Sequence, residues 1–419
     1  MNRAFNKAKD QLKLELRYGS NPNPTAGTVI IIDVDTDNRM KWSLSINDSD
    51  TVNPEVTVYT PADAYIGRYQ VAIYLESEIE GKTEVAIDQE PDIILLCNPW
   101  CQQDTVYMAN DEERNEYVLN DTGLIWRGTT RSSHPCQWNF GQFEEQILDT
   151  TLMVLSRDQR IKAKNGEKKM RDPIWLGRIL SAAANSSDER GILTGNWSGD
   201  YTGGVSPVTW NGSVKIIQQF AETNEPVKFG QCWVFSGLMT TLCRAIGIPT
   251  RSVTNFASAH DTDNTMTIDD FVDENNEDVE GLSGDSCWNF HVWNEIYVEG
   301  RGHWHVDYAG WAAIDATPQE SSNNIMQCGP APIKAIQQGH VYVGYDTGFV
   351  FAEVNADRVT WIVRKIGNSF SIVKMGKQLT RSVGYNISTK SVGSYRRHVL
   401  DDEYKFREGV TFHMTPDDL

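Results

Sequence analysis

Hydrophobic and polar positions alternate in short runs over the first part of the chain, up to about residue 98. Apolar side chains take every second position at 12–16, 40–46 and 69–75, and at 12–16 they alternate with charged residues. Glycine, proline, asparagine and aspartate separate these runs, and such alternation is typical of strands with one buried face. We therefore predict a β-sandwich for residues 1–98.

From residue 99 onward the pattern is mixed. Apolar residues recur at helical spacing over 143–155 and 232–246, whereas the segments around His291, around Ile314 and over 349–354 are strand-like. These features predict an α+β domain for residues 99–419. A chain of 419 residues has room for two or three domains, and it contains no internal repeat.

The chain is acidic, with 38 Lys and Arg against 57 Asp and Glu, a formal net charge of −19. This balance argues against nucleic acid or an anionic membrane surface as the main partner and is compatible with binding cations. No apolar run approaches the roughly 18 residues of a membrane span, and the N-terminus has no signal-peptide core. We expect a cytoplasmic protein without a transmembrane segment, unless it is exported without a signal peptide.

Seven cysteines are spread along the chain without CxxC pairs, which disfavours a disulfide framework or a structural zinc site. One of them, Cys232, begins the predicted helix 232–246, and Gly247 and Pro249 supply its stop signal. The partial positive charge at the first turn of a helix stabilises a thiolate, the nucleophilic form of cysteine. Taken alone, however, such a residue is more often a buried and inert cysteine.

Two later segments could complete a catalytic site around Cys232. His291 stands in the strand-like run 288–298, and Asp315 ends the run 311–315. If these strands are neighbours, the thiolate attacks a carbonyl carbon, the imidazolium protonates the leaving group, and the carboxylate orients the ring. Singly, His291 is more often a core histidine and Asp315 a strand-end cap, but the three residues together favour a catalytic triad.

The residues around these three positions resemble the calcium-dependent transglutaminases of animals. The resemblance rests on Gly-Gln-Cys-Trp at 230–233, on Trp-Asn-Phe-His at 288–291 and on the run 310–320. Supporting similarities lie at 98–101, 138–143, 258–261 and 351–357. It implies an immunoglobulin-like β-sandwich followed by a papain-like, cysteine-protease-type core, and the two C-terminal β-barrels of the family are expected to be absent from this chain.

The resemblance also implies an enzyme that transfers the acyl group of a protein glutamine to a lysine or another primary amine through a thioester on Cys232. Glutamine-containing and lysine-containing proteins and small primary amines are the expected partners. Trp197 would donate its indole N–H to the oxyanion, beside the backbone N–H of Cys232. Trp233 and Trp288 would line the tunnel that admits the amine; core packing is the alternative for both, more strongly for Trp233.

An acidic run over 261–285 suggests a calcium site, because it contains ten Asp and Glu and no Lys or Arg. Oxygen-bearing side chains alternate at its start, which suits a hard cation with six to eight oxygen ligands. The usual reading of such a run is a solvated acidic loop. The resemblance places a calcium ion on five residues: Asp261, Asp263, Thr265, Thr267 and Asp285.

Two further calcium sites are implied by the resemblance alone. The second would use the carbonyl of Ala182 with Asn185, Ser187 and Glu189, although the family commonly carries Asn and Asp at the last two positions. The third would use Asn355, Thr380 and Glu408, and its last family ligand, an acid, aligns with His413, a poor calcium ligand.

Two other functions remain open from the sequence. A thiol hydrolase, protease or deamidase would use the same three residues and the same acyl-enzyme. A catalytically silent scaffold of the same fold would bind without reacting. Aromatic residues beside Cys232 and His291 favour amine transfer over hydrolysis, and silent relatives lose the nucleophile that this chain retains.

Overall fold

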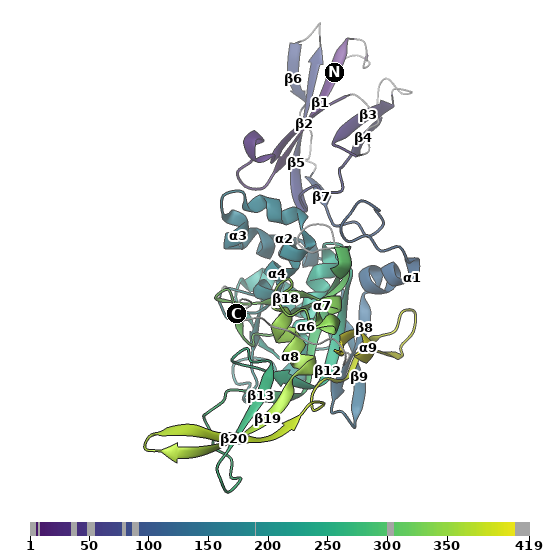
Figure 1. The fold of residues 1–419 in the computed structure, drawn as a ribbon. Helices are drawn as coiled ribbons and strands as arrows, with labels where there is room; N and C mark the ends of the chain where they lie inside the picture. Colours follow the sequence, from purple (N-terminus) through teal and green to yellow (C-terminus); the bar gives the residue numbers. More distant parts are fainter. Residues whose placement is uncertain are drawn as a thin grey trace. The chain divides into compact units, whose positions relative to one another are not determined.

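The computed structural model describes residues 6, 9–34, 40–47, 55–77, 81–85, 92–188, 190–299 and 306–406. Contacts divide the chain into two compact units (Figure 1). The N-terminal unit comprises Met1–Asp104 with Ser156–Asp172, and the second unit comprises Thr105–Leu155 with Pro173–Leu419. The pattern of residues did not predict that 156–172 belongs with the N-terminal unit, and the domain boundary after residue 98 stays a prediction.

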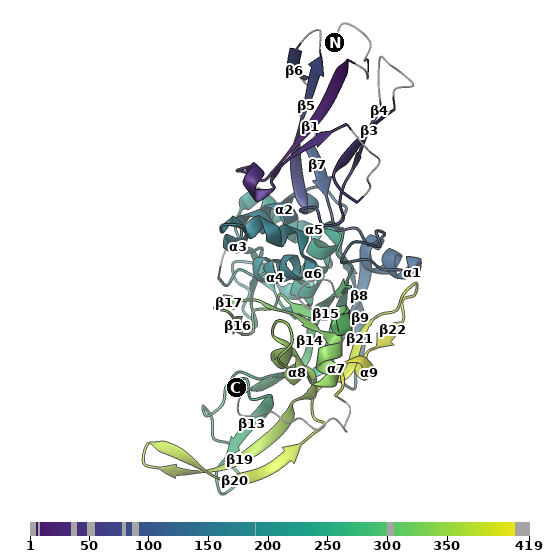
Figure 2. The same cartoon turned by 45° about the horizontal axis from the view of Figure 1, so that its top comes forward.

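Two antiparallel sheets form the body of the N-terminal unit (Figure 2). The elements of this unit are β1 (Asp10–Tyr18), η1 (Pro24–Ala26), β2 (Val29–Asp33), β3 (Ser43–Asn47), β4 (Glu55–Tyr59), β5 (Gly67–Ser77), β6 (Gly81–Val85), β7 (Asp92–Leu95), α3 (Gln159–Lys162) and η3 (Gly166–Arg171). The larger sheet has the order β2-β1-β5-β6 with β7 also on β5, and β3 pairs with β4. Ile46 of β3 and Leu75 of β5 share a core with Leu12, so the alternating apolar positions meet between the sheets.

A six-stranded antiparallel sheet organises the second unit, in the order β18-β15-β14-β12-β21-β22. Its strands are β12 (Thr250–His260), β14 (Ser286–Val298), β15 (Gly310–Asp315), β18 (Cys328–Pro332), β21 (Tyr385–Lys390) and β22 (Arg397–Val399). The other strands of the unit are β8 (Thr122–Gly128), β9 (Ser133–Asn139), β10 (Leu193–Gly195), β11 (Val227–Gly230), β13 (Thr267–Val272), β16 (Ser321–Ser322), β17 (Ile325–Met326), β19 (Asp357–Ile366) and β20 (Ser369–Leu379). In the three-stranded sheet β13-β19-β20, β13 runs parallel to β19.

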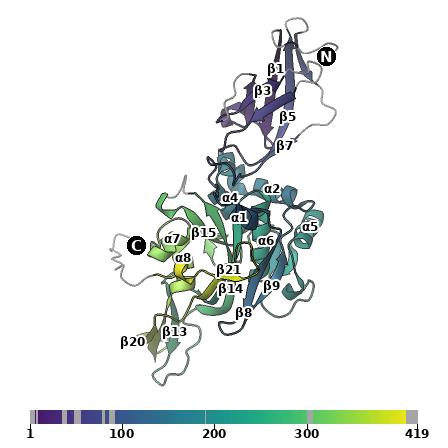
Figure 3. The ribbon, with the colours of Figure 1, turned by 90° about the vertical axis from the view of Figure 1, so that its right-hand side faces the viewer.

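Helix α6 packs against β12 and β14 of the main sheet, and Figure 3 shows α6 beside this sheet. The helices of the second unit are α1 (Asp111–Arg114), the π-helical turn η2 (Asn115–Leu119), α2 (Ile147–Arg157, whose last two residues belong to the N-terminal unit), α4 (Pro173–Ala184), η4 (Pro207–Thr209), α5 (Val214–Thr223), α6 (Cys232–Ala245), η5 (Val306–Tyr308), α7 (Ile333–Gln338), α8 (Thr347–Asn355) and α9 (Asp401–Tyr404). All 14 residues of α6 are buried, which fixes the position of its first residue. No helix in the described ranges is long and apolar enough to cross a membrane.

The predicted helix at 232–246 and the strands at His291 and Ile314 are confirmed, but the strand predicted over 349–354 is wrong. These residues lie in α8. The aromatic and β-branched residues of 349–351 favour a strand by propensity, yet Val350 and Val354 are buried in one core cluster, four residues apart. Tertiary packing of this helical face decides the conformation. The run predicted at 40–46 also starts late, because β3 begins at Ser43 and Met40 is exposed.

Candidate active site

Cys232 is the first residue of α6, directly after β11. The preceding residue, Gln231, is extended, and its side chain donates hydrogen bonds to the carbonyl of Asn196 at 2.9 Å and to the hydroxyl of Tyr201 at 3.2 Å. Gly247, with φ of 83°, ends the helix as predicted. Backbone N–H groups in the first turn of a helix have no partner within it, so Cys232 lies in the positive field that stabilises a thiolate.

His291 and Asp315 come from adjacent strands. Strands β14 and β15 pair antiparallel, and His291 Nε2 lies 2.7 Å from Asp315 Oδ2. His291 is fully buried and Asp315 nearly so. The N–H of Thr317 donates to the second oxygen, Asp315 Oδ1, at 2.8 Å. The carboxylate is therefore held on both oxygens and orients the imidazole ring.

The other ring nitrogen of His291, Nδ1, is buried and has no hydrogen-bond partner among the described residues. Burial lowers the pKa of His291, but Asp315, the Cys232 thiol and Glu353 raise it, and the net pKa lies well above the usual value. With Nε2 engaged by Asp315, Nδ1 is the nitrogen available to the thiol. The three residues predicted as a triad are thus brought together in a geometry that can exchange a proton between sulfur and imidazole.

Two residues to which the sequence assigned no role complete this cluster. The side-chain nitrogen of Gln319 lies 3.1 Å from His291 Nε2, 3.0 Å from Asp315 Oδ2 and 3.0 Å from Glu353 Oε1. Gln319 falls four residues after Asp315, inside the run 310–320 on which the family resemblance rests, and Glu353 falls inside 351–357. The motifs contained both residues, but only the fold shows that they meet.

Glu353 is a buried carboxyl group in α8, 1% exposed. Burial, opposed by His291 and reinforced by Asp315, raises its pKa to about 8. The ligand atoms of His291, Asp315 and Glu353 lie within 4.8 Å of one another, a grouping that could hold a metal ion. The nitrogen of Gln319 already fills the space between them, so an N–H donor takes the place of a cation.

Trp197 and Trp288 lie together beside the triad. Their ring centroids are 6.0 Å apart, and Trp288 stacks on His291 at 5.7 Å and 24°. A Cβ at Gly195 would come within 2.5 Å of the Trp197 ring, so glycine there lets the indole lie against the backbone. Trp197 is 39% exposed, unusual for tryptophan, and its ring is accessible to a substrate.

Trp233, predicted as the second tunnel wall, is buried. Its ring lies 6.1 Å from that of Phe290 and beneath the guanidinium of Arg127 at 4.8 Å. Its indole nitrogen has no hydrogen-bond partner within the described part of the chain. These contacts suit the alternative of core packing, and a role in the tunnel stays a prediction for Trp233.

The five residues predicted for the first calcium site converge. Carboxylate oxygens of Asp261, Asp263 and Asp285 lie within 4.8 Å of one another. Thr265 Oγ1 donates to Asp263 Oδ1 at 2.8 Å and lies 3.0 Å from Thr267 Oγ1. Across the described residues, no basic side chain forms an ion pair with these three carboxylates. Hard oxygen donors gathered without a cationic partner fit a calcium ion.

Burial raises the pKa of Asp261, and hydrogen bonds from the N–H groups of Met266 and Asp263 oppose this effect. At Asp285 burial also raises the pKa, but hydrogen bonds from Thr262 and Asp269 outweigh it, and the net pKa is lowered. Asp285 therefore stays ionised to lower pH than an ordinary aspartate.

The second predicted calcium set lies at the end of α4 and is only partly described. Asn185 Oδ1 accepts a hydrogen bond from the N–H of Ser187 at 3.1 Å, and Asn185 is 2% exposed. Ala182 lies in the last turn of α4, where carbonyl groups lack helical partners. Glu189 lies outside the described residues.

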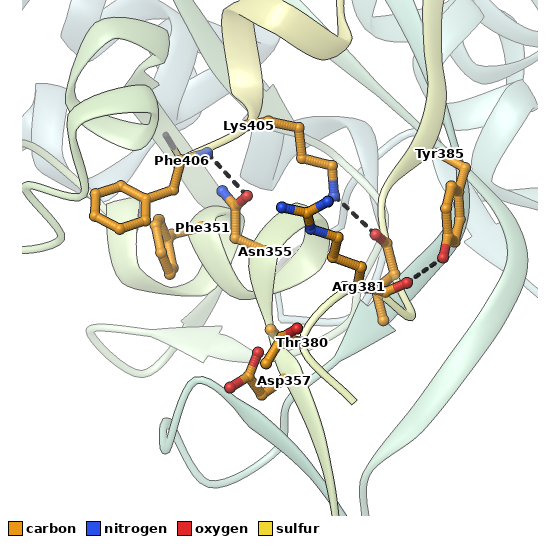
Figure 4. Close-up of a pocket in the computed structure, with 10 residues that line it drawn as sticks. Phe351, Asn355, Asp357, Thr380, Arg381, Tyr385, Lys405 and Phe406 are labelled. Atoms are coloured by element: carbon orange, nitrogen blue, oxygen red, sulfur yellow. Dashed lines mark hydrogen bonds between the residues drawn. The ribbon is translucent and has the colours of Figure 1, made fainter. Parts of the chain in front are cut away.

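The third predicted set lies at a cavity of about 660 Å³, whose lining includes Asn355, Thr380, Asp357, Arg381 and Lys405 (Figure 4). Asn355 Oδ1 already accepts a hydrogen bond from the backbone N–H of Phe406 at 3.1 Å. The cationic side chains of Arg381 and Lys405 line the same cavity, so a calcium ion would meet like charge. This set fits calcium less well than the acidic loop does, and its remaining residue, Glu408, lies outside the described residues.

Known proteins share both units of this chain. A model described as "Transglutaminase family" matches residues 1–76, and one described as "Transglutaminase-like superfamily" matches residues 202–316, which contain the triad. Human protein-glutamine gamma-glutamyltransferase 4 is 41% identical over 400 residues, 95% of this chain, and annulin of Schistocerca americana is 42% identical over 373 residues, 88% of this chain. The crystal structure of red sea bream transglutaminase superposes with a TM-score of 0.82 at 38% identity over 96% of this chain.

The chain belongs to the transglutaminase family. The predicted mixed fold, an N-terminal β unit followed by an α+β transglutaminase core, is confirmed. The chain spans about half the length of the curated relatives that it matches, 47% of annulin and 57% of the human transferase. It likewise covers 59% of the sea bream transglutaminase.

Proposed function

We propose that this transglutaminase-family chain catalyses calcium-dependent acyl transfer from the side-chain amide of a protein glutamine to a lysine or another primary amine. The observation that supports the proposal most is the 2.7 Å contact between His291 Nε2 and Asp315 Oδ2, with the free Nδ1 left to the thiol of Cys232. Protein substrates that carry glutamine and lysine, and small primary amines, are the partners in this proposal.

The reaction proceeds in two halves. The Cys232 thiolate attacks the carboxamide carbon of glutamine, His291 donates a proton to the amide nitrogen, and the carbon–nitrogen bond breaks to release ammonia and leave a thioester. An amine then attacks the thioester carbon, His291 takes up the amine proton, and the carbon–sulfur bond breaks as the new amide forms. Water in place of the amine gives glutamate instead.

The oxyanion of each half needs donors. The backbone N–H of Cys232 is unpaired within its helix, and the indole N–H of Trp197 is the second donor in this proposal. Trp197 and Trp288, whose rings lie 6.0 Å apart, would line the channel for the amine. Apolar walls at that place exclude the water that would hydrolyse the thioester.

Replacing Trp197 by phenylalanine is expected to lower kcat for acylation roughly a hundredfold, because an oxyanion donor is worth on the order of 3 kcal/mol. KM should change little, since most of the apolar bulk remains. Trp210→Phe is the matched control: it removes the indole N–H that donates to the carbonyl of Phe229 at 2.9 Å, outside the triad. A change confined to KM would instead identify Trp197 as a packing residue.

Calcium is the cofactor in this proposal. Asp261, Asp263 and Asp285, with Thr265 and Thr267, would hold the ion in the loop that precedes β14. When bound, it neutralises carboxylates that otherwise repel one another and ties the loop to the strand that carries His291. The chemistry at the thioester is left to the protein side chains.

The double variant Asp263→Ala, Asp285→Ala is expected to lose most of the calcium dependence of both activity and Tm. A ligand at a hundred times its Kd stabilises the folded state by about 2.7 kcal/mol, and removing two carboxylates removes most of that gain. The matched control is Asp270→Ala with Glu274→Ala, two carboxylates of the same run that pair with Arg358 and Arg364 instead. A calcium response unaltered in the first variant would show that the run is a solvated acidic loop.

The experiment that tests the function is incorporation of a fluorescent primary amine into casein, with calcium and with excess chelator. Acyl transfer gives labelled, intact casein only with calcium. Casein fragments would indicate a thiol protease, glutamate without label a deamidase, and unchanged casein a silent scaffold. A cytoplasmic location is part of the same proposal, and seven cysteines without a disulfide support it.

A further inference from the structure

Gln319 lies at the centre of three buried groups of the candidate active site. Its side-chain nitrogen is 3.0 to 3.1 Å from His291 Nε2, Asp315 Oδ2 and Glu353 Oε1. The three groups come from β14, β15 and α8, and each is at most 3% exposed. The Gln319 side chain thus connects β14, β15 and α8 beside His291, the residue proposed to transfer protons in the reaction.

The hydrogens of this amide decide the tautomer of His291. A glutamine side-chain nitrogen carries two hydrogens, and two oxygens, on Asp315 and Glu353, are placed to accept them. None is left for His291 Nε2, which must therefore keep its own hydrogen and donate it to Asp315 at 2.7 Å. The neutral ring then has its lone pair on Nδ1, the nitrogen that exchanges a proton with Cys232.

The side-chain oxygen of Gln319 contacts Trp288, one of the two residues proposed to line the amine channel. Gln319 Oε1 accepts the indole N–H of Trp288 at 3.1 Å. The Trp288 ring in turn stacks on His291 and lies 6.0 Å from Trp197. A tilt of Trp288 would open the space between the two tryptophans to water, and this hydrogen bond fixes the tilt.

We propose that Gln319 is a positioning residue that couples the amine channel to the triad: its nitrogen fixes the tautomer of His291 through Asp315 and Glu353, and its oxygen fixes Trp288. The proposal rests on the acyl-transfer function proposed above. Only an amide offers two donors to two carboxyl groups and one acceptor to an indole without adding charge. Gln319 therefore determines how often the thioester is resolved by an amine rather than by water.

Three variants separate the two halves of this role. Gln319→Leu removes the donors and the acceptor at similar volume, whereas Gln319→Glu keeps an acceptor for Trp288 but loses both donors. Trp288→Phe removes the indole N–H and part of the ring but leaves both donors of Gln319 in place. Gln142→Leu is the matched control, because the side-chain nitrogen of Gln142, like that of Gln319, donates to two oxygens: the carbonyl groups of Val118 and Asn120, at 3.0 Å.

The first measurement is the ratio of amine incorporation to hydrolysis of a glutamine peptide, read by mass spectrometry at fixed amine concentration. We expect the ratio to fall about tenfold in Gln319→Leu and in Trp288→Phe, the size typical of one lost orienting hydrogen bond, and to fall less in Gln319→Glu. Gln142→Leu should lower Tm and leave the ratio unchanged. An unchanged ratio in Gln319→Leu would overturn the channel half of the proposal.

The second measurement is the pH dependence of Cys232 alkylation by iodoacetamide, which needs no transferase activity. The titratable groups that interact with His291 are Asp315, Glu353 and Cys232. Both Gln319 variants should move the profile, while Trp288→Phe and Gln142→Leu should not. If the alkylation profile is unchanged in both Gln319 variants, the proposal that Gln319 fixes the tautomer of His291 is overturned. If Cys232 of the parent protein reacts normally with iodoacetamide but no amine is incorporated, the proposed acyl-transfer function fails. The alkylation profile still tests whether Gln319 fixes the tautomer of His291.

Discussion

Replacing Cys232 by alanine is expected to abolish amine incorporation and leave the fold unchanged. The substitution removes a single sulfur atom at the first position of α6, and alanine is the best helix former. Loss of the nucleophile of a comparable triad costs on the order of a millionfold in kcat. The measurement is fluorescent-amine incorporation into casein, with Tm recorded on the same samples.

Cys243 provides the matched control on the same helix. It is fully buried, and burial raises the pKa of its thiol to about 12, so it stays protonated and unreactive. Cys243→Ala should lower Tm through the small cavity that it leaves but retain activity. A Cys232→Ala variant with nearly the parent rate would refute the assignment of the nucleophile.

Asp315→Asn is expected to fold normally and to lose on the order of 10⁴-fold in kcat, as in other triads in which the carboxylate becomes an amide. The asparagine fills the same volume, but its NH2 group can face His291 Nε2 and stabilise the wrong tautomer. The rate of amine incorporation at saturating substrate measures this loss. An unchanged rate would remove Asp315 from the triad.

The same variant has a predicted pH signature. Burial lowers the pKa of His291, whereas the Asp315 carboxylate is the largest of the effects that raise it, and the net pKa is high. Because the pKa is raised, the imidazolium that stabilises the Cys232 thiolate persists to higher pH. Without the carboxylate the pKa of His291 falls, the imidazolium is lost at lower pH than in the parent, and iodoacetamide alkylation of Cys232 should shift to higher pH. Asp307→Asn, outside this cluster, should leave the profile in place.

The sequence predicted the parts of the fold that depend on local pattern. Helix α6 follows from apolar spacing with a stop at Gly247, and β1 follows from an alternation in which Leu14 and Leu16 are buried. Cys232, His291 and Asp315 could be named because each stands within a motif of the family, Cys232 at the start of a helix, His291 inside a strand and Asp315 at the end of a strand. The structure brings the three together, and their roles stay predictions until the variants are measured.

What the sequence could not predict depends on contacts between distant segments. Over 349–354 the aromatic and β-branched residues favour a strand, and only the core that receives Val350 and Val354 selects a helix. The role proposed for Gln319 needs Glu353, which is 34 residues away along the chain. No periodicity or spacing within either motif encodes that meeting.

Residues 156–172 make the two units of the chain interdependent. The chain leaves the N-terminal unit after Asp104, re-enters it at Ser156 and leaves again after Asp172, so each unit is discontinuous in sequence. Met170 accepts a hydrogen bond from the N–H of Ile66 at 2.8 Å, within the N-terminal unit. An N-terminal fragment that stops near residue 104 therefore lacks part of its own structure, and the remaining polypeptide carries a segment whose packing partner has been removed. The N-terminal unit can therefore be exchanged between proteins intact only if both of its segments, Met1–Asp104 and Ser156–Asp172, are transferred together.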